Sequence, residues 1–332
     1  MEILKPIHGI IIAAALTGCS EEFDPGIEVT PALCINSLIT SGEPFDINVS
    51  HTWLYSDRNA ELDHTVPDAE VSVYADDKLQ HSGYLPLEGD HIRIVADSHL
   101  YGHAEAEVTV PVSVTVLPLR WTPVVTDIYT SEESTTIVFH LNVEMEIMDD
   151  SKADNYYRLS YSSILPHEGI DSIWAASTPP GVSFNGGTFK DDAEPIFSEH
   201  IGVLESALGG DTYGFTFFTD RQFSGKSYTL HLQYSDCRFT ISTPRPDPSQ
   251  WHCGYEFTLH TISKSYYNWA NYLWQRDDSP MGDISEAGFG DPIWGYSNVS
   301  TGAGIVAAQS SRNYTINLKD FLIQTLTSPP EE

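Results

Sequence analysis

Basic side chains are scarce in this chain of 332 residues. Lysine and arginine number 16 against 47 aspartate and glutamate residues, which gives a formal net charge of −31. Binding to nucleic acid requires a basic surface that neutralises phosphates, so we predict no nucleic-acid partner. The same shortage argues against adhesion of the folded body to anionic lipid. We interpret the acidity as a solubilising surface and not as a specific cation-binding device.

Cysteine is also rare, with four residues in the chain. Cys237 ends one alternating segment and Cys253 opens the next, across a turn that contains three prolines. If the two segments lie side by side as strands, a disulfide between these cysteines stabilises the fold by about 3 kcal/mol through the unfolded state. We predict this disulfide. Cys34 is then left over, and we expect a buried, inert thiol.

Sequence motifs of known chemistry are absent. The chain has no Gly-x-Ser-x-Gly nucleophile elbow, His-Glu-x-x-His metal helix or glycine-rich phosphate loop. His99 and His103 have the spacing of helical zinc ligands, but Gly102 indicates a turn, where we expect exposed histidines. Acidic residues near 149–154 and 277–283 lack the spacing of a calcium loop, so we expect solvated acids. We therefore predict no catalytic residue, no metal and no cofactor.

No apolar run is long enough to span a bilayer. A short run at residues 10–16 follows Lys5 and leads to Thr17-Gly18-Cys19. A basic residue, a short apolar core and small residues before a cysteine form the pattern of a bacterial lipoprotein signal. We predict a signal peptide over residues 1–18 and lipidation of Cys19. Several acyl chains, palmitate among them, would anchor the protein stably in a membrane.

The segment after Cys19 is acidic. Ser20-Glu21-Glu22-Phe23-Asp24 resembles the export tag that follows the lipid-bearing cysteine of many Bacteroidetes surface lipoproteins. The alternative is a plain acidic tether in a protein that faces the periplasm. We favour an outer-membrane protein that faces the exterior, and we assign residues 19–27 to the tether.

Most of the remaining chain alternates apolar and polar residues, which is the period of a half-buried strand. The clearest alternating runs are residues 45–49, 69–73, 104–110, 137–143, 228–234 and 255–259. Short runs separated by glycine, proline and aspartate predict a mainly β fold. We expect a β-sandwich over residues 28–115, a larger β-rich domain over 116–326, and a tail over 327–332.

One stretch departs from the β period. Its bulky residues fall on one face at helical spacing: Tyr266, Trp269, Tyr272 and Leu273. Ser263 is placed to cap the first turn, so we predict a helix over residues 263–275. Its aromatic face has two interpretations. We favour packing onto a sheet over a platform on which a sugar or another flat ligand stacks.

Two regions are predicted to hold ligand-contacting loops, residues 162–212 and 277–304. The second includes a glycine-rich stretch from Gly288 to Tyr296. We predict that its bulky side chains contact a ligand or partner: Phe289, Ile293, Trp294 and Tyr296. An equally weighted alternative is a loop that folds back over the end of a sheet.

Five segments resemble, in this order, those of one known family. They are Leu33-Cys34-Ile35-Asn36-Ser37, Val66-Pro67-Asp68-Ala69, Phe218-Thr219-Asp220-Arg221, Ser263-Lys264-Ser265-Tyr266-Tyr267 and Tyr296-Ser297-Asn298-Val299. With them the chain resembles, from residue 33 to about residue 308, the domain of unknown function 4249 family of Bacteroidetes lipoproteins. The resemblance implies an immunoglobulin- or transthyretin-like sandwich for the N-terminal domain, and it implies no chemistry.

Members of that family look like outer-membrane lipoproteins encoded near TonB-dependent, SusC-like transporters. The resemblance therefore implies a lipid-anchored binding protein that assists such a transporter in nutrient capture. Two alternatives stay open. One is an envelope hydrolase whose site no motif marks, and the other is a structural or adhesin-type surface lipoprotein.

Overall fold

The computed structural model describes residues 30–53, 63–150, 153–164, 182–202, 206–207, 214–248, 251 and 253–327. The predicted signal peptide, Cys19 and the acidic tether lie outside these ranges, as do residues 328–332 of the predicted tail. Within them, no helix combines the length and the apolar character that crossing a bilayer requires.

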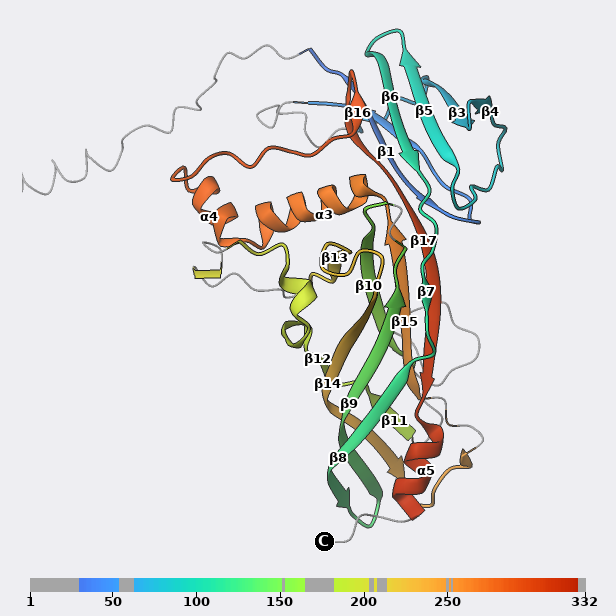
Figure 1. Ribbon diagram of the computed structural model, residues 1–332, viewed down its shortest axis with the longest axis vertical. Helices are drawn as coiled ribbons and strands as arrows, with labels where there is room; N and C mark the ends of the chain where they lie inside the picture. The colour runs from blue at the N-terminus through green and yellow to red at the C-terminus, as the bar shows by residue number, and fades with distance from the viewer. Residues whose placement is uncertain are drawn as a thin grey trace, which may run out of the picture.

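Three β-sheets contain nearly half of the described residues, so the predicted mainly β fold is confirmed (Figure 1). The first sheet has the order β13-β10-β15-β17-β1-β2 and consists of β1 (Leu33–Thr40), β2 (Asn48–His51), β10 (Tyr156–Ile164), β13 (Phe217–Thr219), β15 (Gly254–Ile262) and β17 (Ala303–Asn317). The second consists of β7 (Thr115–Val116), β8 (Arg120–Thr130), β9 (Ser134–Met148), β11 (Val182–Asn185), β12 (Thr188–Phe189) and β14 (Ser227–Ser242). The third has the order β16-β6-β5-β3-β4 and consists of β3 (Glu70–Ala75), β4 (Lys78–Leu79), β5 (His91–Ser98), β6 (Gly102–Thr109) and β16 (Val299–Ser300).

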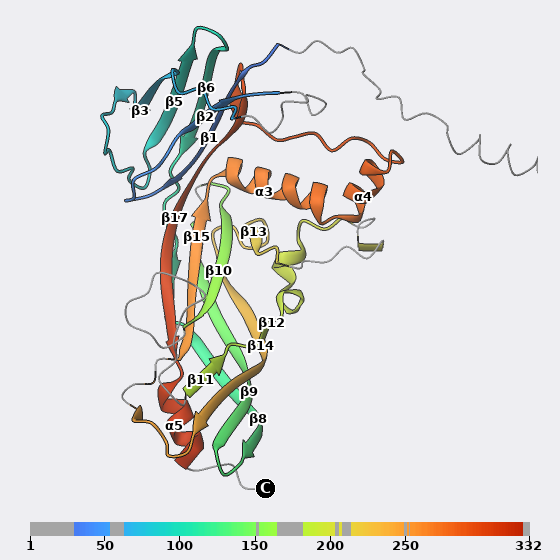
Figure 2. The same ribbon diagram turned by 180° about the vertical axis from the view of Figure 1, so that it is seen from behind.

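The molecule is elongated, with the third sheet at its upper end and α5 (Lys319–Thr327) at its lower end (Figures 1 and 2). Two hydrophobic cores follow this axis. The lower core lies between the first and second sheets, where alternate side chains of β9 and β14 point inward. The upper core lies between the third sheet and the β1 end of the first sheet.

Strand β17 joins the two halves. Its first part pairs in parallel with β1, with Cys34 opposite Ala303, and its second part, from Gln309 to Asn317, pairs antiparallel with β15. Gly304 has a φ of +110°, and a Cβ there would lie 2.2 Å from the carbonyl oxygen of Ile35. Glycine therefore permits the close approach of the two strands.

The parallel pairing of β1 with β17 also concerns the predicted boundary between two domains near residue 115. Strands β1 and β2 belong to one sheet with β15 and β17, and β16 completes the edge of the third sheet beside β6. The N-terminal region therefore shares both of its layers with C-terminal strands. The resemblance of this region to an immunoglobulin or transthyretin sandwich stays a prediction.

The described part of the predicted loop region 162–212 is structural. Strands β11 and β12 pair with β14, and the 3₁₀ turns η1 (Asp191–Ala193) and η2 (Pro195–Ser198) follow them. Phe197 is fully buried in the lower core. Glu194 is buried too, and its carboxylate accepts from the Tyr228 hydroxyl at 2.7 Å and from the His231 amide at 2.6 Å. Residues 165–181, 203–205 and 208–212 of this region lie outside the described chain.

The predicted helix is confirmed as α3 (Lys264–Asp277), with the Ser263 hydroxyl accepting from the Tyr266 amide at 3.3 Å. Its buried aromatic and aliphatic residues are Tyr266, Ala270 and Trp274. The predicted face is therefore partly correct, because Tyr266 is buried and the half-buried Trp269 packs against the same cluster. Tyr272 and Leu273 are half-buried, and the sequence did not indicate Ala270 or Trp274. The true face follows i, i+4 spacing, and it packs toward β17 and β13.

The predicted disulfide is not formed, since Cys237 and Cys253 are both free, buried thiols. The prediction assumed neighbouring strands, but β14 lies in the second sheet and β15 in the first. Cys237 instead donates to the carbonyl of Gly186 at 3.5 Å and accepts from the Tyr255 hydroxyl at 3.1 Å. Cys34, expected to be buried, is half-buried on β1.

Candidate functional site

The four side chains predicted to contact a ligand or partner divide into two pairs. Phe289 and Trp294 are 89% and 82% exposed, and both stand on the segment between α4 (Pro280–Glu286) and β16. Ile293 and Tyr296 are half-buried. The segment therefore neither folds back as a cover nor gathers its four bulky residues into one site.

Glycines set the path of this segment. Gly288, with a φ of +76°, ends α4 in a Schellman arrangement: its amide donates to Ser285, and the Phe289 amide donates to Ile284, both at 3.0 Å. Farther on, a Cβ at Gly295 would lie 3.7 Å from the Tyr272 hydroxyl. The backbone thus passes close to α3 and α4 while two aromatic side chains project outward.

A groove of about 950 Å³ lies where the upper and lower halves meet. It is bordered by the end of β6 and the chain after it, the β9–β10 connection, the first turn of α3, and the segment before β16. Its lining includes Val112, Asp154, Tyr156, Lys264, Asn268 and Tyr296. Tyr296 is thus the member of the predicted loop that reaches a concave site.

The groove offers both rings and hydrogen-bonding groups. The ring of Tyr156 lies 5.2 Å from that of Tyr267, between centroids, and burial together with the nearby Asp154 carboxylate raises the pKa of the Tyr156 hydroxyl. That hydroxyl is therefore neutral at physiological pH and serves as a donor. Lys264 and Asn268 add an ammonium group and an amide from α3. This chemistry suits a polar ligand with an apolar face.

Acidic residues beside the groove have structural roles. Asp149 accepts from the Tyr157 hydroxyl at 2.6 Å, from the Asn155 side chain at 2.9 Å and from the Gly225 amide at 2.8 Å. It thereby ties β10 to the turn before β14, whereas the sequence had predicted a solvated acid. Asp220 is buried, and desolvation raises the pKa of its carboxyl.

His99 and His103 do not form a metal pair in the structure. The Nδ1 atom of His103 lies 2.8 Å from Asp97, and its Nε2 atom lies 3.6 Å from Glu105. Hydrogen bonding to Asp97 raises the pKa of His103. Across the described ranges, no three histidine, cysteine or acidic side chains gather closely enough to hold a metal ion.

A hydrogen-bonded series that sequence reasoning missed crosses the first sheet. Ser160 of β10 bonds to His260 Nε2, and His260 Nδ1 lies 2.8 Å from the hydroxyl of Ser311 on β17. Burial, followed by the charge of Arg158, lowers the pKa of His260 to about 4. The three residues are far apart in sequence, so only the strand register reveals the series.

This series is poorly suited to nucleophilic catalysis. A histidine with a pKa near 4 is a weak general base at neutral pH. The surrounding backbone amides belong to the β10–β15–β17 ladder, so they are not free to stabilise an oxyanion. The series therefore acts as a polar link between three strands.

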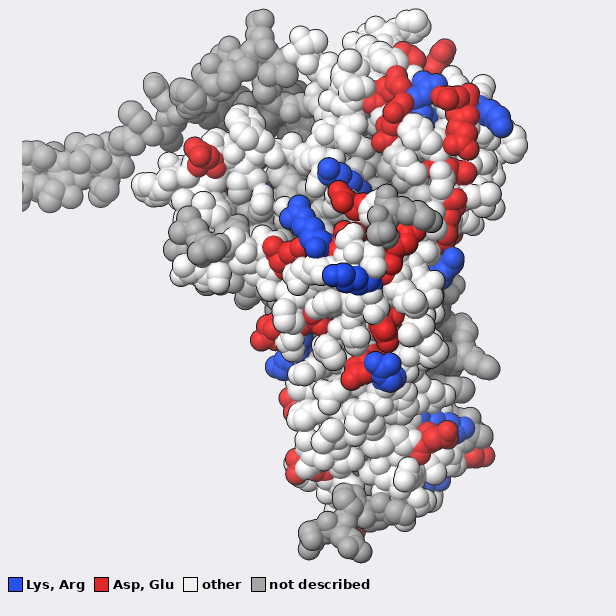
Figure 3. Space-filling view, in the orientation of Figure 1, with Lys and Arg blue, Asp and Glu red and all other residues white. Residues whose placement is uncertain are grey.

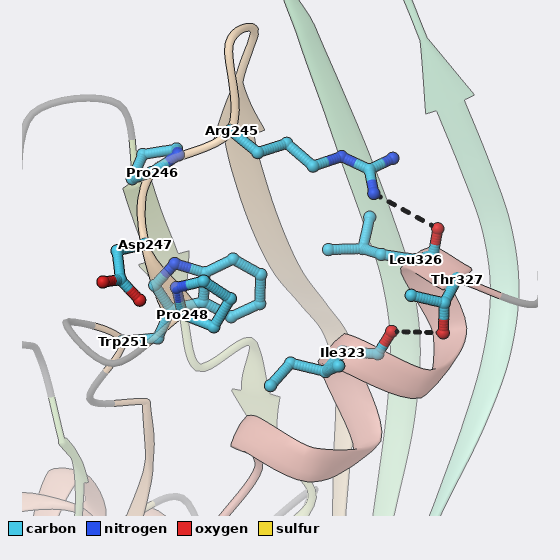
Figure 4. A pocket seen from close by; sticks show the side chains of 8 residues that line it. All are labelled: Arg245, Pro246, Asp247, Pro248, Trp251, Ile323, Leu326 and Thr327. Atoms are coloured by element: carbon cyan, nitrogen blue, oxygen red, sulfur yellow. Dashed lines mark hydrogen bonds between the residues drawn. The ribbon is translucent and has the colours of Figure 1, made fainter.

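A second, smaller hollow of about 220 Å³ lies at the lower end, between the turn after β14 and α5 (Figure 4). The ring of Trp251 and the side chains of Ile323 and Leu326 form apolar walls. Arg245 lies at its edge and donates to the Leu326 carbonyl at 3.4 Å. This hollow is remote from the predicted loop, and its size suits one side chain.

The comparisons with known proteins identify one family. No curated protein and no solved structure matches the chain. The family described as "Domain of unknown function (DUF4249)" matches residues 20–315, which is most of the sequence. The chain therefore belongs to the DUF4249 family.

Proposed function

We propose that this chain is a Bacteroidetes outer-membrane lipoprotein, anchored through Cys19, that faces the exterior and binds a ligand without transforming it. The groove at the junction of the two halves carries the proposal, because it is concave, large enough for a ligand and lined by rings and polar groups. The lipoprotein signal and the acidic residues after Cys19 support the location.

The proposed partner is a TonB-dependent, SusC-like transporter, to which the lipoprotein delivers a nutrient. The resemblance to transporter-associated lipoproteins supports this partner. The extended shape supports it as well, because the long β9–β14 body offers a surface separate from the groove (Figure 1). A hydrolytic role is disfavoured, since the Ser160–His260–Ser311 series lacks a competent base and free oxyanion donors.

Ligand capture is tested with a panel of oligosaccharides and short peptides, by the rise in melting temperature of the mature protein. Y296A and N268A remove groove contacts, and Y129A at the exposed end of β8 is the matched control. We expect a ligand whose binding is lost in both groove variants and kept in Y129A. Equal binding by all three would contradict the assignment of the groove.

The transporter is tested by crosslinking and mild solubilisation of outer membranes, followed by recovery of the lipoprotein. Stoichiometric recovery of a TonB-dependent barrel is expected. Recovery of the lipoprotein alone would refute the accessory role while leaving the groove assignment to its own assay. Mass spectrometry of the N-terminal peptide checks acylation of Cys19 separately.

A further inference from the structure

Phe289 and Trp294 are the two most exposed large hydrophobic side chains of the described chain, at 89% and 82%. Large apolar side chains that project from a folded surface mark contact sites for proteins or membranes. The groove does not use either ring, because Tyr296 is the aromatic residue of this segment that lines it. The exposed pair therefore calls for a separate explanation.

The helix cap does not account for the position of Phe289. In a Schellman arrangement the residue at this position commonly packs back against the preceding turn, here at Ile284. The hydrogen bonds of the arrangement are present, yet the Phe289 ring remains exposed. Gly290 allows the backbone to approach Ile284 instead, since a Cβ there would lie 3.1 Å from the Ile284 Cγ2.

The surroundings of the pair are poor in charge. Asp291 is the one charged residue between Ala287 and Asn298, in a chain with 63 charged residues. Figure 3 shows the surface over α4 and the following segment as largely uncharged, whereas acidic and basic side chains gather over the third sheet and the middle of that face. Aromatic side chains favour the headgroup level of a bilayer, and charged ones are costly below it.

The shape of the segment favours lipid over a protein partner. A stable protein interface takes about 800 Å² from each partner on a broad surface. Two rings five residues apart, on a segment with neither helix nor strand, offer a small wedge and not a broad surface. Such a wedge fits between lipid headgroups.

The location of the segment agrees with a membrane nearby. In both ribbon views residues 30–32, which lead into β1, and the α4–β16 segment project toward the same side of the molecule, away from β3 (Figures 1 and 2). Ten residues lie between Cys19 and Thr30, the first described residue. Such a length spans at most about 40 Å when extended.

We infer that Phe289 and Trp294 insert into the headgroup region of a zwitterionic lipid surface and hold the protein in a fixed orientation on it. The acidic body disfavours anionic lipid, so the rings and not charges make this contact. This contact is additional to the proposed function, and it needs only that the N-terminus is held near the membrane.

The test uses the chain from Ser20 onward with an N-terminal histidine tag, held on phosphatidylcholine vesicles by a nickel-chelating lipid. Phosphatidylcholine brominated in its acyl chains quenches the fluorescence of tryptophans that enter the bilayer. We expect quenching in the wild type and loss of most of it in W294F. W53F, which removes another exposed tryptophan, is the matched control and keeps the quenching.

A second variant, F289S, keeps Trp294, whose fluorescence reports entry into the bilayer. F289S removes half of the wedge, and we expect at least twofold weaker quenching of Trp294, whereas L79S at another exposed apolar residue leaves it unchanged. Absence of quenching in the wild type, or equal quenching in W294F, would overturn the inference. Because the tag replaces the lipid, neither result depends on acylation of Cys19 or on the groove.

Discussion

The two cores of this protein are built from side chains of different size. The lower core is rich in rings, and Phe139, Tyr157 and Phe239 are fully buried there. The upper core consists of leucine, isoleucine, valine and alanine, with Ala104 fully buried. Aromatic residues such as Phe45 only border it.

Side-chain size sets how closely the layers approach. A Cβ at Gly302 would lie 3.0 Å from that of Ala104, so β6 and the start of β17 are in close contact. In the lower half, rings such as Phe239 and Trp251, 5.3 Å apart between centroids, fill a wider space between two long sheets. The stability of the lower half therefore depends on large side chains that fill the space between its sheets. The stability of the upper half depends on small side chains that let its layers pack closely.

Removal of a ring from the lower core is expected to have the largest effect. F239A leaves a cavity at a fully buried site and should lower the free energy of unfolding by about 3–5 kcal/mol. F289A, at an exposed phenylalanine, should change it by no more than about 0.5 kcal/mol. Chemical denaturation measures both. Similar losses in the two variants would show that the lower core is not the source of stability.

Enlargement of a side chain is the matching test of the upper core. A104L overpacks the contact with Gly302 and should cost about 1–3 kcal/mol. A287L adds the same atoms at an exposed position and should be close to neutral. The same denaturation assay applies. If A104L left the free energy of unfolding unchanged, the layers of the upper half could move apart without a loss of stability.

A smaller effect is expected in the pH dependence of stability, and its cause is His260 on the outer face of the first sheet. The pKa of His260 is about 4 in the folded chain, below its unfolded value near 6.5. The unfolded state therefore binds the proton first, and stability present above pH 6.5 is lost as the pH falls toward 4. We expect a loss of roughly 1–2 kcal/mol after allowance for solvent screening. H260Q should flatten this part of the profile, and an unchanged profile would exclude His260 as its cause.

The reactivity of the thiols should also differ between the two halves, and measuring it does not involve a change in stability. Burial raises the pKa of Cys253 to about 12 and also raises that of Cys237, so both lower thiols should resist a thiol reagent in the native chain. Cys34 of the upper half is half-buried and should react first. In the chain from Ser20 onward, denaturation should expose three thiols to the reagent. If only one thiol reacted after denaturation, Cys237 and Cys253 would be joined by a disulfide, contrary to the structure.

Local sequence patterns predicted the elements well. The six alternating runs overlap six strands, β2, β3, β6, β9, β14 and β15, and Ser263 with the helical spacing after it predicted α3. These features depend on neighbouring residues, so a single sequence carries them. The face of α3 was less accurate, because packing against β13 and β17 selects Tyr266, Ala270 and Trp274.

Contacts between distant segments could not be predicted. The disulfide was wrong because alternation does not say which sheet a strand joins, and β14 and β15 lie in different ones. The groove joins the end of β6, the β9–β10 connection and α3, so no local window contains it. Of the four residues predicted to contact a ligand or partner, the structure places Tyr296 at the groove and leaves Phe289 and Trp294 exposed.

The parallel pairing of β1 with β17 also has a consequence for how the chain reaches its native state. The Ile305 amide donates to the Asn36 side chain, 269 residues away in sequence. Contacts of such long range form slowly, because a large loop must close before they contribute. Synthesis begins at the N-terminus, so β1 is made first, and its partner β17 is the last strand to be made. The upper half therefore completes its folding only after nearly the whole polypeptide is available.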